Sequence, residues 1–570
     1  MRYLKLTEVY EEVSSTTKRL EKIKILSKFF RYLHDDDMEV LYLLMGDIYP
    51  EYDDRKIGIS NQLAIKALSK ATGTNEKQIV KEWKKLGDIG LVAEVLVAGK
   101  KQTTLHSHIL TTEKVLTNLR KLPELVGKGT VNKKLGLITE LLTSAKTKEA
   151  LYLIRTLIGD LRIGIQESTI RAGMAAAFFD GKKEAAKKIE TAIDKTNDLV
   201  AVFEIAKKGK LKGFDKLSVQ VGKPIKAMLA QKAVTIEDGF KSLGKPCAVE
   251  YKYDGFRLLI HKKQGVVTLF TRTLENVTKQ FPDVVEYINK HIKGHSFIID
   301  SEAVGFHKKT KEYTSFQNIS QRIRRKHHIE RLVKELPVEV NAFDIIYYNG
   351  KSLIEDSFEK RSKILRKIIQ NKPFKIITAK QIITGDAKKA KEFYKKALKD
   401  NQEGVMMKNL KAEYKPGRRV GHMLKIKPEE RDLDLVITGA EYGTGKRSGW
   451  LSSFILSCKK GDKYLEIGKM GTGIKEKSAD EVGGVSFEEL TKMLKPLITE
   501  EHGKSVKIKP KIVVAVTYQE IQKSPNYNSG YALRFPRFTD LRPDKKPKDA
   551  TTLEEVEKDF VNQKRNWKYG

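Results

Sequence analysis

Cysteine is nearly absent from this chain of 570 residues, which contains only Cys247 and Cys458. Two cysteines cannot build a disulfide framework or a four-cysteine zinc site, so the composition fits a reducing, cytoplasmic compartment. Long apolar runs are also missing. The most apolar run, "AGMAAAFF" at 172–179, is far shorter than a membrane span, and "MRYLKLTEVY" at the start lacks the apolar core of a signal peptide. We therefore expect a soluble intracellular protein with no membrane partner.

Positive charge, in contrast, is abundant. The chain has 109 Lys and Arg residues against 73 Asp and Glu residues, which gives a net charge of +36 and an isoelectric point of about 9.7. Such an excess indicates a polyanionic partner, and nucleic acid is the first candidate. The alternative is the lysine-rich surface of a heat-adapted protein. Charge alone does not decide between the two.

The hydrophobic pattern changes twice along the chain. Residues 1–214 have apolar positions three or four apart, beginning behind a predicted N-cap cluster at 14–17, and this spacing is typical of helices. Residues 215–427 mix short β-rich runs with helical stretches such as 358–369, and residues 428–570 show short strands with glycine turns. We predict a multi-domain fold, with an all-α part, an α+β part and a small β-barrel.

The segment "AVEYKYDGFRLLIH" at 248–261 has the apolar content of a buried strand, yet it contains Glu250, Lys252, Asp254 and Arg257. Four charges are a poor choice for a strand that only packs. The pattern Lys-x-Asp-Gly is a weak signal by itself, because a lysine-rich chain produces such matches by chance. Taken alone, Lys252 is better explained as an ion-pair partner on a strand surface.

Further motifs follow this segment in a fixed order. They are "TRTLEN" with Arg272, "IIDSEAV" with Glu302, "AFDIIYY" with Phe343, "EGVMMK" with Glu403, "YKPGRRVGHMLKIK" with Arg419, Lys425 and Lys427, and "RFPRFTDLRPDK" with Arg542, Asp544 and Lys545.

This ordered set resembles the motifs of covalent nucleotidyltransferases, and most closely those of ATP-dependent DNA ligases of the archaeal and eukaryotic replicative type. The resemblance covers nearly the whole chain and includes long runs such as "LIRTLIGDLRIGIQEST" at 153–169. It implies a helical DNA-binding domain at 1–214, an adenylation domain of the nucleotidyltransferase fold at 215–427, and an OB-fold domain with a C-terminal extension at 428–570.

The resemblance assigns the chemistry of AMP transfer to Lys252. Its ε-amine would attack the α-phosphorus of ATP and release pyrophosphate, which divides one hard condensation into three displacements. Arg257 and Arg272 would neutralise phosphate oxygens with forked donors. Glu250 would meet the adenine, and Phe343 would stack on the base, although an isolated aromatic in such a run is usually core.

The resemblance also implies a metal site and a triphosphate site. Glu302 and Glu403 match the acidic positions for the ribose and the catalytic metal, with Asp300 as an alternative supporting residue. Arg419, Lys425 and Lys427 match basic positions that bind nucleotide, although His422-Met423 replaces a common aromatic there. In the C-terminal domain, Arg542 and Lys545 would contact the β and γ phosphates, and Asp544 would hold one of them.

The implied cofactors are ATP and Mg²⁺, with Mn²⁺ as a substitute, and the implied partner is nicked double-stranded DNA. We expect a monomer, associated with the nucleoid. Residues 100–109 stand where relatives carry a sliding-clamp peptide, with Gln102 present but Leu105 and His106 in place of the usual aromatics. The basic stretch at 321–334 is either a DNA-facing helix or a solvated face.

Two other classes of protein remain open at this point. An RNA ligase or a GTP-using capping enzyme would share Lys252 and the later motifs, but neither explains a separate helical domain. A non-catalytic DNA-binding protein would explain the charge but not the ordered acidic and aromatic positions. An NAD-using ligase is disfavoured because two cysteines cannot build the zinc finger of that family.

Overall fold

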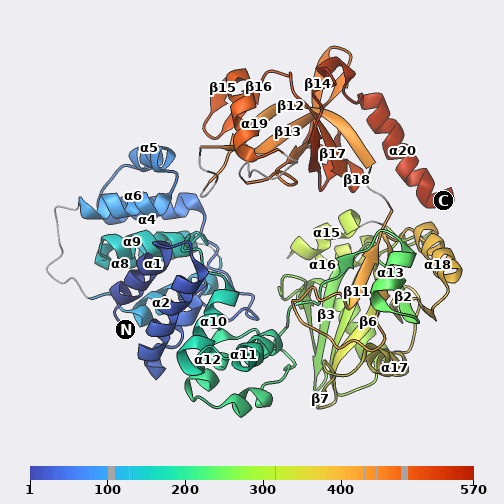
Figure 1. The fold of residues 1–570 in the computed structure, drawn as a ribbon, viewed down its shortest axis with the longest axis horizontal. Helices are drawn as coiled ribbons and strands as arrows, with labels where there is room; N and C mark the ends of the chain where they lie inside the picture. The colour runs from blue at the N-terminus through green and yellow to red at the C-terminus, as the bar shows by residue number, and fades with distance from the viewer. Residues whose placement is uncertain are drawn as a thin grey trace. The chain divides into compact units, whose positions relative to one another are not determined.

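The computed structural model describes residues 1–99, 109–127, 129–314, 316–325, 327–428, 431–444, 447, 449–476 and 485–569 (Figure 1). The chain forms two compact units. The first consists of Met1–Val80 and Ile89–Lys427, and the second of Lys81–Asp88 and Pro428–Gly570. Within the described ranges, no helix combines the length and the apolar content needed to cross a bilayer.

The N-terminal part of the chain is helical, as the apolar spacing predicts. Its helices are α1 (Tyr3–Ser14), α2 (Arg19–Tyr32), α3 (Val40–Leu44), α4 (Asn61–Thr72), α5 (Glu76–Leu86), α6 (Ile89–Ala98), α7 (Thr112–Glu124), α8 (Thr130–Ser144), α9 (Thr147–Leu157), α10 (Glu167–Phe178), α11 (Lys183–Thr196) and α12 (Leu199–Lys207). Local signals set several ends: Ser60 and Asp198 cap α4 and α12 through their side chains, and Gly73 ends α4 in the left-handed conformation. The predicted cap cluster at 14–17 is wrong, because Lys18 precedes α2 and makes no side-chain cap bond.

Two sheets form the mixed part of the first unit. The five-stranded sheet has the order β1-β11-β10-β2-β9, and the six-stranded sheet has the order β4-β3-β5-β6-β7 with β8 beside β6. Their bounds are β1 (Gln231–Lys232), β2 (Cys247–Lys252), β3 (Phe256–Lys263), β4 (Val266–Thr271), β5 (Ser296–Gly305), β6 (Val338–Tyr348), β7 (Lys351–Ser352), β8 (Ile376–Thr378), β9 (Gln381–Thr384), β10 (Gly404–Lys408) and β11 (Met423–Ile426).

Helices cover these sheets and complete their apolar cores. They are α13 (Ile236–Leu243), α14 (Pro282–His291), α15 (Phe316–Arg324), α16 (Ile329–Glu335), α17 (Phe358–Ile368) and α18 (Ala387–Lys399). One core packs Val284 of α14 and Leu365 of α17 against the six-stranded sheet. Another packs Phe240 of α13 and Ala390 of α18 against the five-stranded sheet. The burial of both faces explains why strands such as β6 read as nearly continuous apolar runs.

The segment 248–261 is not one strand. It divides into β2, in the five-stranded sheet, and β3, in the six-stranded sheet, so the chain passes from one sheet to the other at 253–255. Glycine is required at 255, because a Cβ atom there would lie 2.9 Å from the carbonyl carbon of Ala303 and 3.0 Å from Cγ of Glu302. The Lys-x-Asp-Gly motif therefore lies where the two sheets meet.

The C-terminal unit is built on a seven-stranded sheet. The long strand β12 (Arg431–Tyr442) pairs with β13 (Leu451–Lys460) along one edge and with β16 (Ser505–Ile508) and β17 (Val513–Tyr518) along the other. The remaining elements are β14 (Lys463–Met470), β15 (Ile498–His502), β18 (Glu520–Lys523), β19 (Tyr531–Arg534), β20 (Arg537–Leu541), α19 (Phe487–Leu494) and α20 (Leu553–Tyr569). The sheet and α19 enclose one apolar core, as expected for a half-barrel. The predicted fold class is confirmed.

The basic stretch at 321–334 contains a buried arginine. Arg322 on α15 is fully buried and pairs with Asp283 of α14, with one Nη1–Oδ2 distance of 3.1 Å. It also donates to the carbonyl oxygens of Gln280 and Leu336. Arg322 therefore ties α15 to α14 and is not available to DNA.

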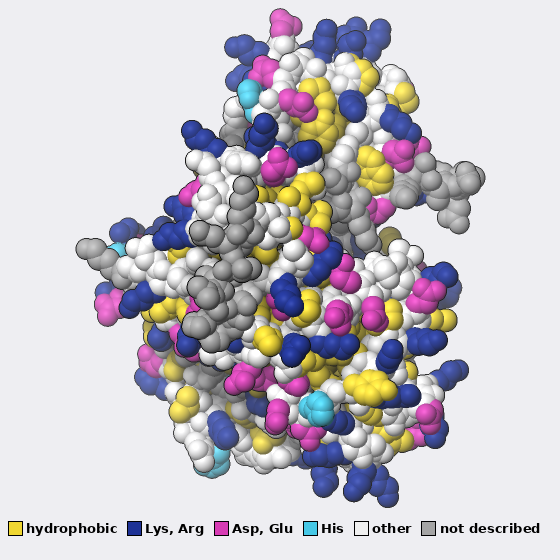
Figure 2. Space-filling model, turned by 90° about the vertical axis from the view of Figure 1, so that its left-hand side faces the viewer, with side chains coloured by type: hydrophobic (Ala, Val, Ile, Leu, Met, Phe, Trp, Pro, Cys, Tyr) yellow, Lys and Arg dark blue, Asp and Glu magenta, His cyan; other side chains and the backbone are white. Residues whose placement is uncertain are grey.

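Basic side chains are widely distributed over the surface. On the face in Figure 2, Lys and Arg side chains lie from edge to edge, interspersed with acidic and apolar ones. The net charge of +36 is thus not gathered into a single patch on that face.

Candidate active site

The register of the five-stranded sheet brings basic and acidic positions onto one face. Gly404 lies opposite Lys252, and Met406 lies between Glu250 on β2 and Lys425 on β11. Cross-strand partners and residues two apart share a face of a sheet. Glu250, Lys252 and Lys425 therefore project to the same side.

Glu403, immediately before β10, joins two of the lysines. Its Oε2 lies 2.7 Å from Nζ of Lys252 and also pairs with Nζ of Lys427. Its backbone N–H donates to the carbonyl oxygen of Lys252 at 2.9 Å. Burial would raise the pKa of Glu403, but the two ammonium groups outweigh it and hold that pKa at about 2. Glu403 is therefore ionised and holds the Lys252 amine at the edge of the sheet.

A second carboxyl group, Glu302, lies across from Arg257 in the pairing of β3 with β5. Burial raises the pKa of Glu302 to about 8, although Lys252 and Arg257 oppose this, and the charges of Glu403 and Asp300 add to it. Glu302 and Glu403 thus lie within electrostatic reach of each other, and a divalent cation held by these two groups would favour their ionised forms. Mg²⁺ needs few protein ligands because it keeps water and phosphate oxygens. The two carboxyl groups fit a magnesium site.

Arg257 is fixed by a buried acid. Its Nε donates to Oδ1 of Asp300 at 2.7 Å, and its Nη2 also pairs with that carboxylate. Tyr414 donates its hydroxyl to Oδ2 of Asp300 at 2.8 Å. The guanidinium carbon lies 5.2 Å from the ring centroid of Phe343. Asp300, which the sequence suggests as a supporting residue of the acidic site, is thus engaged with Arg257 and Tyr414.

Glu250 is held by two residues that the sequence reasoning missed. Its Oε2 lies 2.6 Å from Nζ of Lys408, the last residue of β10, and its Oε1 accepts from Nε2 of Gln381 at 2.7 Å. Lys408 also donates to the carbonyl oxygen of Phe343 at 3.2 Å and lies 4.8 Å from the centroid of that ring. Lys408 stands in the "EGVMMK" run, but nothing in that run indicates its partners.

The other predicted cations surround the same face. The pKa of Lys425 is lowered by burial and then by the charges of Lys427, Lys252 and Arg419. The Arg419 side chain is exposed, as is that of Arg272, which lines a small cavity together with Arg257. These side chains carry more positive charge than Glu403 can neutralise. Such an excess of positive charge favours the binding of a triphosphate.

The predicted C-terminal residues form a cluster within the second unit. Arg542 Nη1 lies 2.8 Å from Oδ1 of Asp434, and Lys545 Nζ lies 2.6 Å from Oδ2 of the same carboxylate. Asp544 pairs with Arg542 at 2.7 Å. Asp544 holds Arg542, in line with the expectation, but the residue that joins both cations is Asp434, which was not predicted.

Three family models match the chain. They are "DNA ligase N terminus" at residues 2–175, "ATP dependent DNA ligase domain" at 227–427 and "ATP dependent DNA ligase C terminal region" at 447–545. A DNA ligase from Nanoarchaeum equitans is 42% identical over 566 residues, covering 99% of both chains. The chain belongs to the ATP-dependent DNA ligase family. A DNA ligase from Thermococcus fumicolans is 38% identical over 570 residues, again covering 99% of both chains.

The fold of the ligase is also found in a solved structure described as Pmar-Lig_PreS3. That structure is 18% identical, has a TM-score of 0.57, and the match covers 94% of this chain and 99% of the other. Members of the family use ATP and a divalent metal ion to seal nicks in DNA through an adenylate intermediate. The prediction of an ATP-dependent DNA ligase is therefore confirmed, and the capping-enzyme, RNA-ligase and non-catalytic alternatives are set aside.

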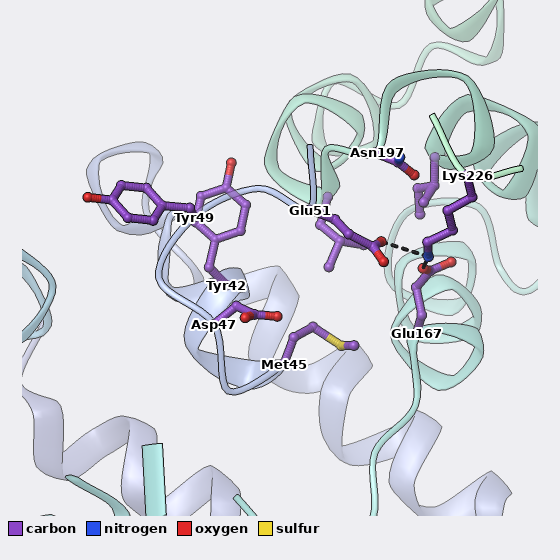
Figure 3. A pocket seen from close by; sticks show the side chains of 10 residues that line it. Tyr42, Met45, Asp47, Tyr49, Glu51, Glu167, Asn197 and Lys226 are labelled. Atoms are coloured by element: carbon purple, nitrogen blue, oxygen red, sulfur yellow. Dashed lines mark hydrogen bonds and ion pairs between the residues drawn. The ribbon is translucent and has the colours of Figure 1, made fainter. Parts of the chain in front are cut away.

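The ligase has a second cavity in its first unit, with a volume of about 220 Å³ (Figure 3). Asp47, Glu51 and Glu167 line it, and Nζ of Lys226 lies 2.6 Å from Glu51 and 2.9 Å from Glu167. Three carboxyl groups around one engaged lysine disfavour a polyphosphate. The predicted nucleotide residues do not line this cavity, so we do not place ATP there.

Proposed function

We propose that this ligase seals nicks in duplex DNA by carrying AMP on Nζ of Lys252. The amine would bond to the α-phosphorus of ATP, and the bond from that phosphorus to the pyrophosphate would break. The observation that carries this proposal is the position of Lys252 at the end of β2, where the chain passes from one sheet to the other and where Glu403 holds its Nζ at 2.7 Å. The same AMP would then pass to the 5′-phosphate of the nick, and the 3′-hydroxyl would displace it.

The neighbouring cations have roles that follow from their charge. Lys425, Lys427 and Arg419 would bind the triphosphate, and the planar donors of Arg257 and Arg272 would bind phosphate oxygens. Since Asp300 and Tyr414 fix Arg257, it would enter the reaction already oriented.

Phe343 and Glu250 would bind the adenine. The Phe343 side chain is half-buried and packs against the core of the five-stranded sheet, and the accessible part of its ring would stack on the base. Glu250 lies on the same side of β2 as Lys252, which brings base recognition within two residues of the nucleophile.

Glu302 and Glu403 would hold Mg²⁺, with Mn²⁺ as a substitute. A bound divalent cation would stabilise the negative charge that develops on the phosphate oxygens. Glu403 also pairs with Lys252 and Lys427, so the same carboxylate would position the attacking lysine. Lys252 would attack as the neutral amine, after giving up its proton.

The three predicted domains would have different roles in the reaction. We infer domain boundaries at 214/215 and 427/428, with the helical part gripping the duplex through its phosphates. Arg542 and Lys545 would exchange Asp434 for the β and γ phosphates and so orient the leaving pyrophosphate. We further infer a monomer that acts on DNA in the cytoplasm, associated with the nucleoid. The sliding-clamp contact at 100–109 is retained as a proposal, and all but Ile109 of that segment lies outside the described residues.

Labelled ATP tests the central step. The protein is incubated with ATP labelled at the α or the γ phosphate and then separated by denaturing electrophoresis. We expect label on the protein only from the α position. Label from the γ position, or no label from either, would contradict a covalent AMP carrier.

A further inference from the structure

The edge of the proposed adenine site contains a side-chain amide whose orientation is fixed. Gln381 begins β9 and lies directly opposite Glu250 in the pairing of β2 with β9. Because direct partners share a face, Gln381 projects to the side of the sheet that carries Glu250 and Lys252. This inference rests on the proposed function, in which that face binds ATP.

The hydrogen bonds of Gln381 determine which of its atoms faces a ligand. Nε2 donates to Oε1 of Glu250 at 2.7 Å and approaches Oγ of Ser362 at 3.5 Å. An ionised carboxylate can only accept, and Glu250 is ion-paired with Lys408, so the amide nitrogen has to face Glu250. The two hydrogens of Nε2 are thus directed at Glu250 and Ser362. The carbonyl oxygen Oε1 remains, and among the described contacts it has no partner.

Lys408 places this amide at the edge of the proposed base. The Lys408 ammonium lies 2.6 Å from Glu250 and 4.8 Å from the Phe343 ring centroid, so the carboxylate and the ring flank the same cation. A purine stacked on Phe343 would direct its edge toward Glu250 and Gln381. Both oxygens of Glu250 already have partners, whereas Oε1 of Gln381 accepts no hydrogen bond from the part of the chain that the structure describes.

We infer that Gln381 is a specificity residue whose carbonyl oxygen accepts a hydrogen bond from the 6-amino group of adenine and thereby selects ATP over GTP. Adenine has a donor at position 6, and guanine has an acceptor there. Guanine would place its 6-oxygen against Oε1, and the amide could not turn its nitrogen to the ligand without breaking the bond to Glu250. A site that is built to bond one group rejects the analogue that lacks it.

The test combines a side-chain change with removal of one group from the nucleotide. Gln381→Met keeps the length of the side chain and removes the acceptor. Purine riboside triphosphate keeps the ring and the triphosphate and lacks the 6-amino group. Single-turnover formation of the nucleotidyl-enzyme, at nucleotide concentrations below saturation, is followed by intact-protein mass spectrometry. Gln370→Met, at an exposed glutamine beyond the end of α17, is the matched control.

We expect Gln381→Met to slow the reaction with ATP about tenfold, as for the loss of one hydrogen bond, and to leave the rate with purine riboside triphosphate unchanged. The preference for ATP over GTP should fall by a similar factor. The thermal unfolding midpoint of Gln381→Met should match that of Gln370→Met, which shows that the variant is folded. An equal loss with both nucleotides, or a loss with ATP of less than about threefold, would overturn the inference. If the wild type formed no AMP-enzyme at all, the proposed function would fail as well.

Discussion

Lys252→Ala separates the carrier role of this lysine from the rest of the site. Lys427 is the other ammonium that contacts Glu403, so the variant keeps one ion pair at that carboxylate. The lost pair is partly exposed, with 21% of the Lys252 side chain accessible. Such a pair stabilises the arrangement of the site by up to about 1 kcal/mol, which corresponds to a factor of about five in a rate constant. Transfer of AMP from ATP to the protein should vanish, because a positioned amine has an effective concentration that no other group supplies.

The assay compares two reactions of the same preparation. One is labelling from ATP carrying the label at its α phosphate, and the other is sealing of a nick whose 5′-phosphate already bears AMP. We expect no labelling, while sealing falls by about fivefold. Lys263→Ala, at the exposed far end of β3, is the control and should change neither. Wild-type labelling by Lys252→Ala would refute the assignment, and labelling that disappears only when Lys427 is also replaced would name Lys427 as a second carrier.

Three further predictions test other parts of the chain. Deleting residues 1–210 should leave self-adenylylation largely intact while nick sealing becomes weak and more salt-sensitive, as measured over a salt series; equal sealing by both proteins at raised salt would contradict a DNA-gripping role. Lys545→Ala should slow AMP-enzyme formation from ATP severely and slow sealing of a pre-adenylylated nick much less, in single-turnover assays; equal losses would indicate a role in folding or DNA binding. Arg322→Met should lower the free energy of unfolding by about 3 kcal/mol because it leaves Asp283 buried and unpaired, whereas the exposed Arg325→Met should change it little; thermal unfolding measures both.

Local patterns were enough to predict most of the elements. The β-rich runs that contain "IIDSEAV" and "AFDIIYY" became β5 and β6, and the helical stretch at 358–369 became α17, because apolar periodicity acts over a few residues. The break between two strands within the segment 248–261 cannot be predicted from the local pattern. The residues of this segment suit a strand throughout, and only contact with the distant Ala303 explains why the chain turns at Gly255.

The residues that sequence reasoning missed share one property. Gln381 is 131 positions from Glu250, and Asp434 is 111 positions from Lys545. Pairs of this kind depend on strand register and domain packing, which no local spacing encodes. Arg322 illustrates the reverse case, because a basic run suggests a solvated or DNA-facing helix until tertiary packing buries one of its members.

The turn at Gly255 joins the two sheets of the first unit and packs closely against the main chain of β5. The turn lies against Ala303, the neighbour of Glu302, so main-chain atoms set the spacing between the end of β2, which carries Lys252, and the strand β5, which carries Glu302. A side chain at 255 would collide with the backbone of Ala303, so the two strands would have to move apart. A misplacement of about 1 Å costs enzymes on the order of a hundredfold in rate. The missing Cβ atom at 255 is therefore what allows the strands that carry Lys252 and Glu302 to approach each other this closely.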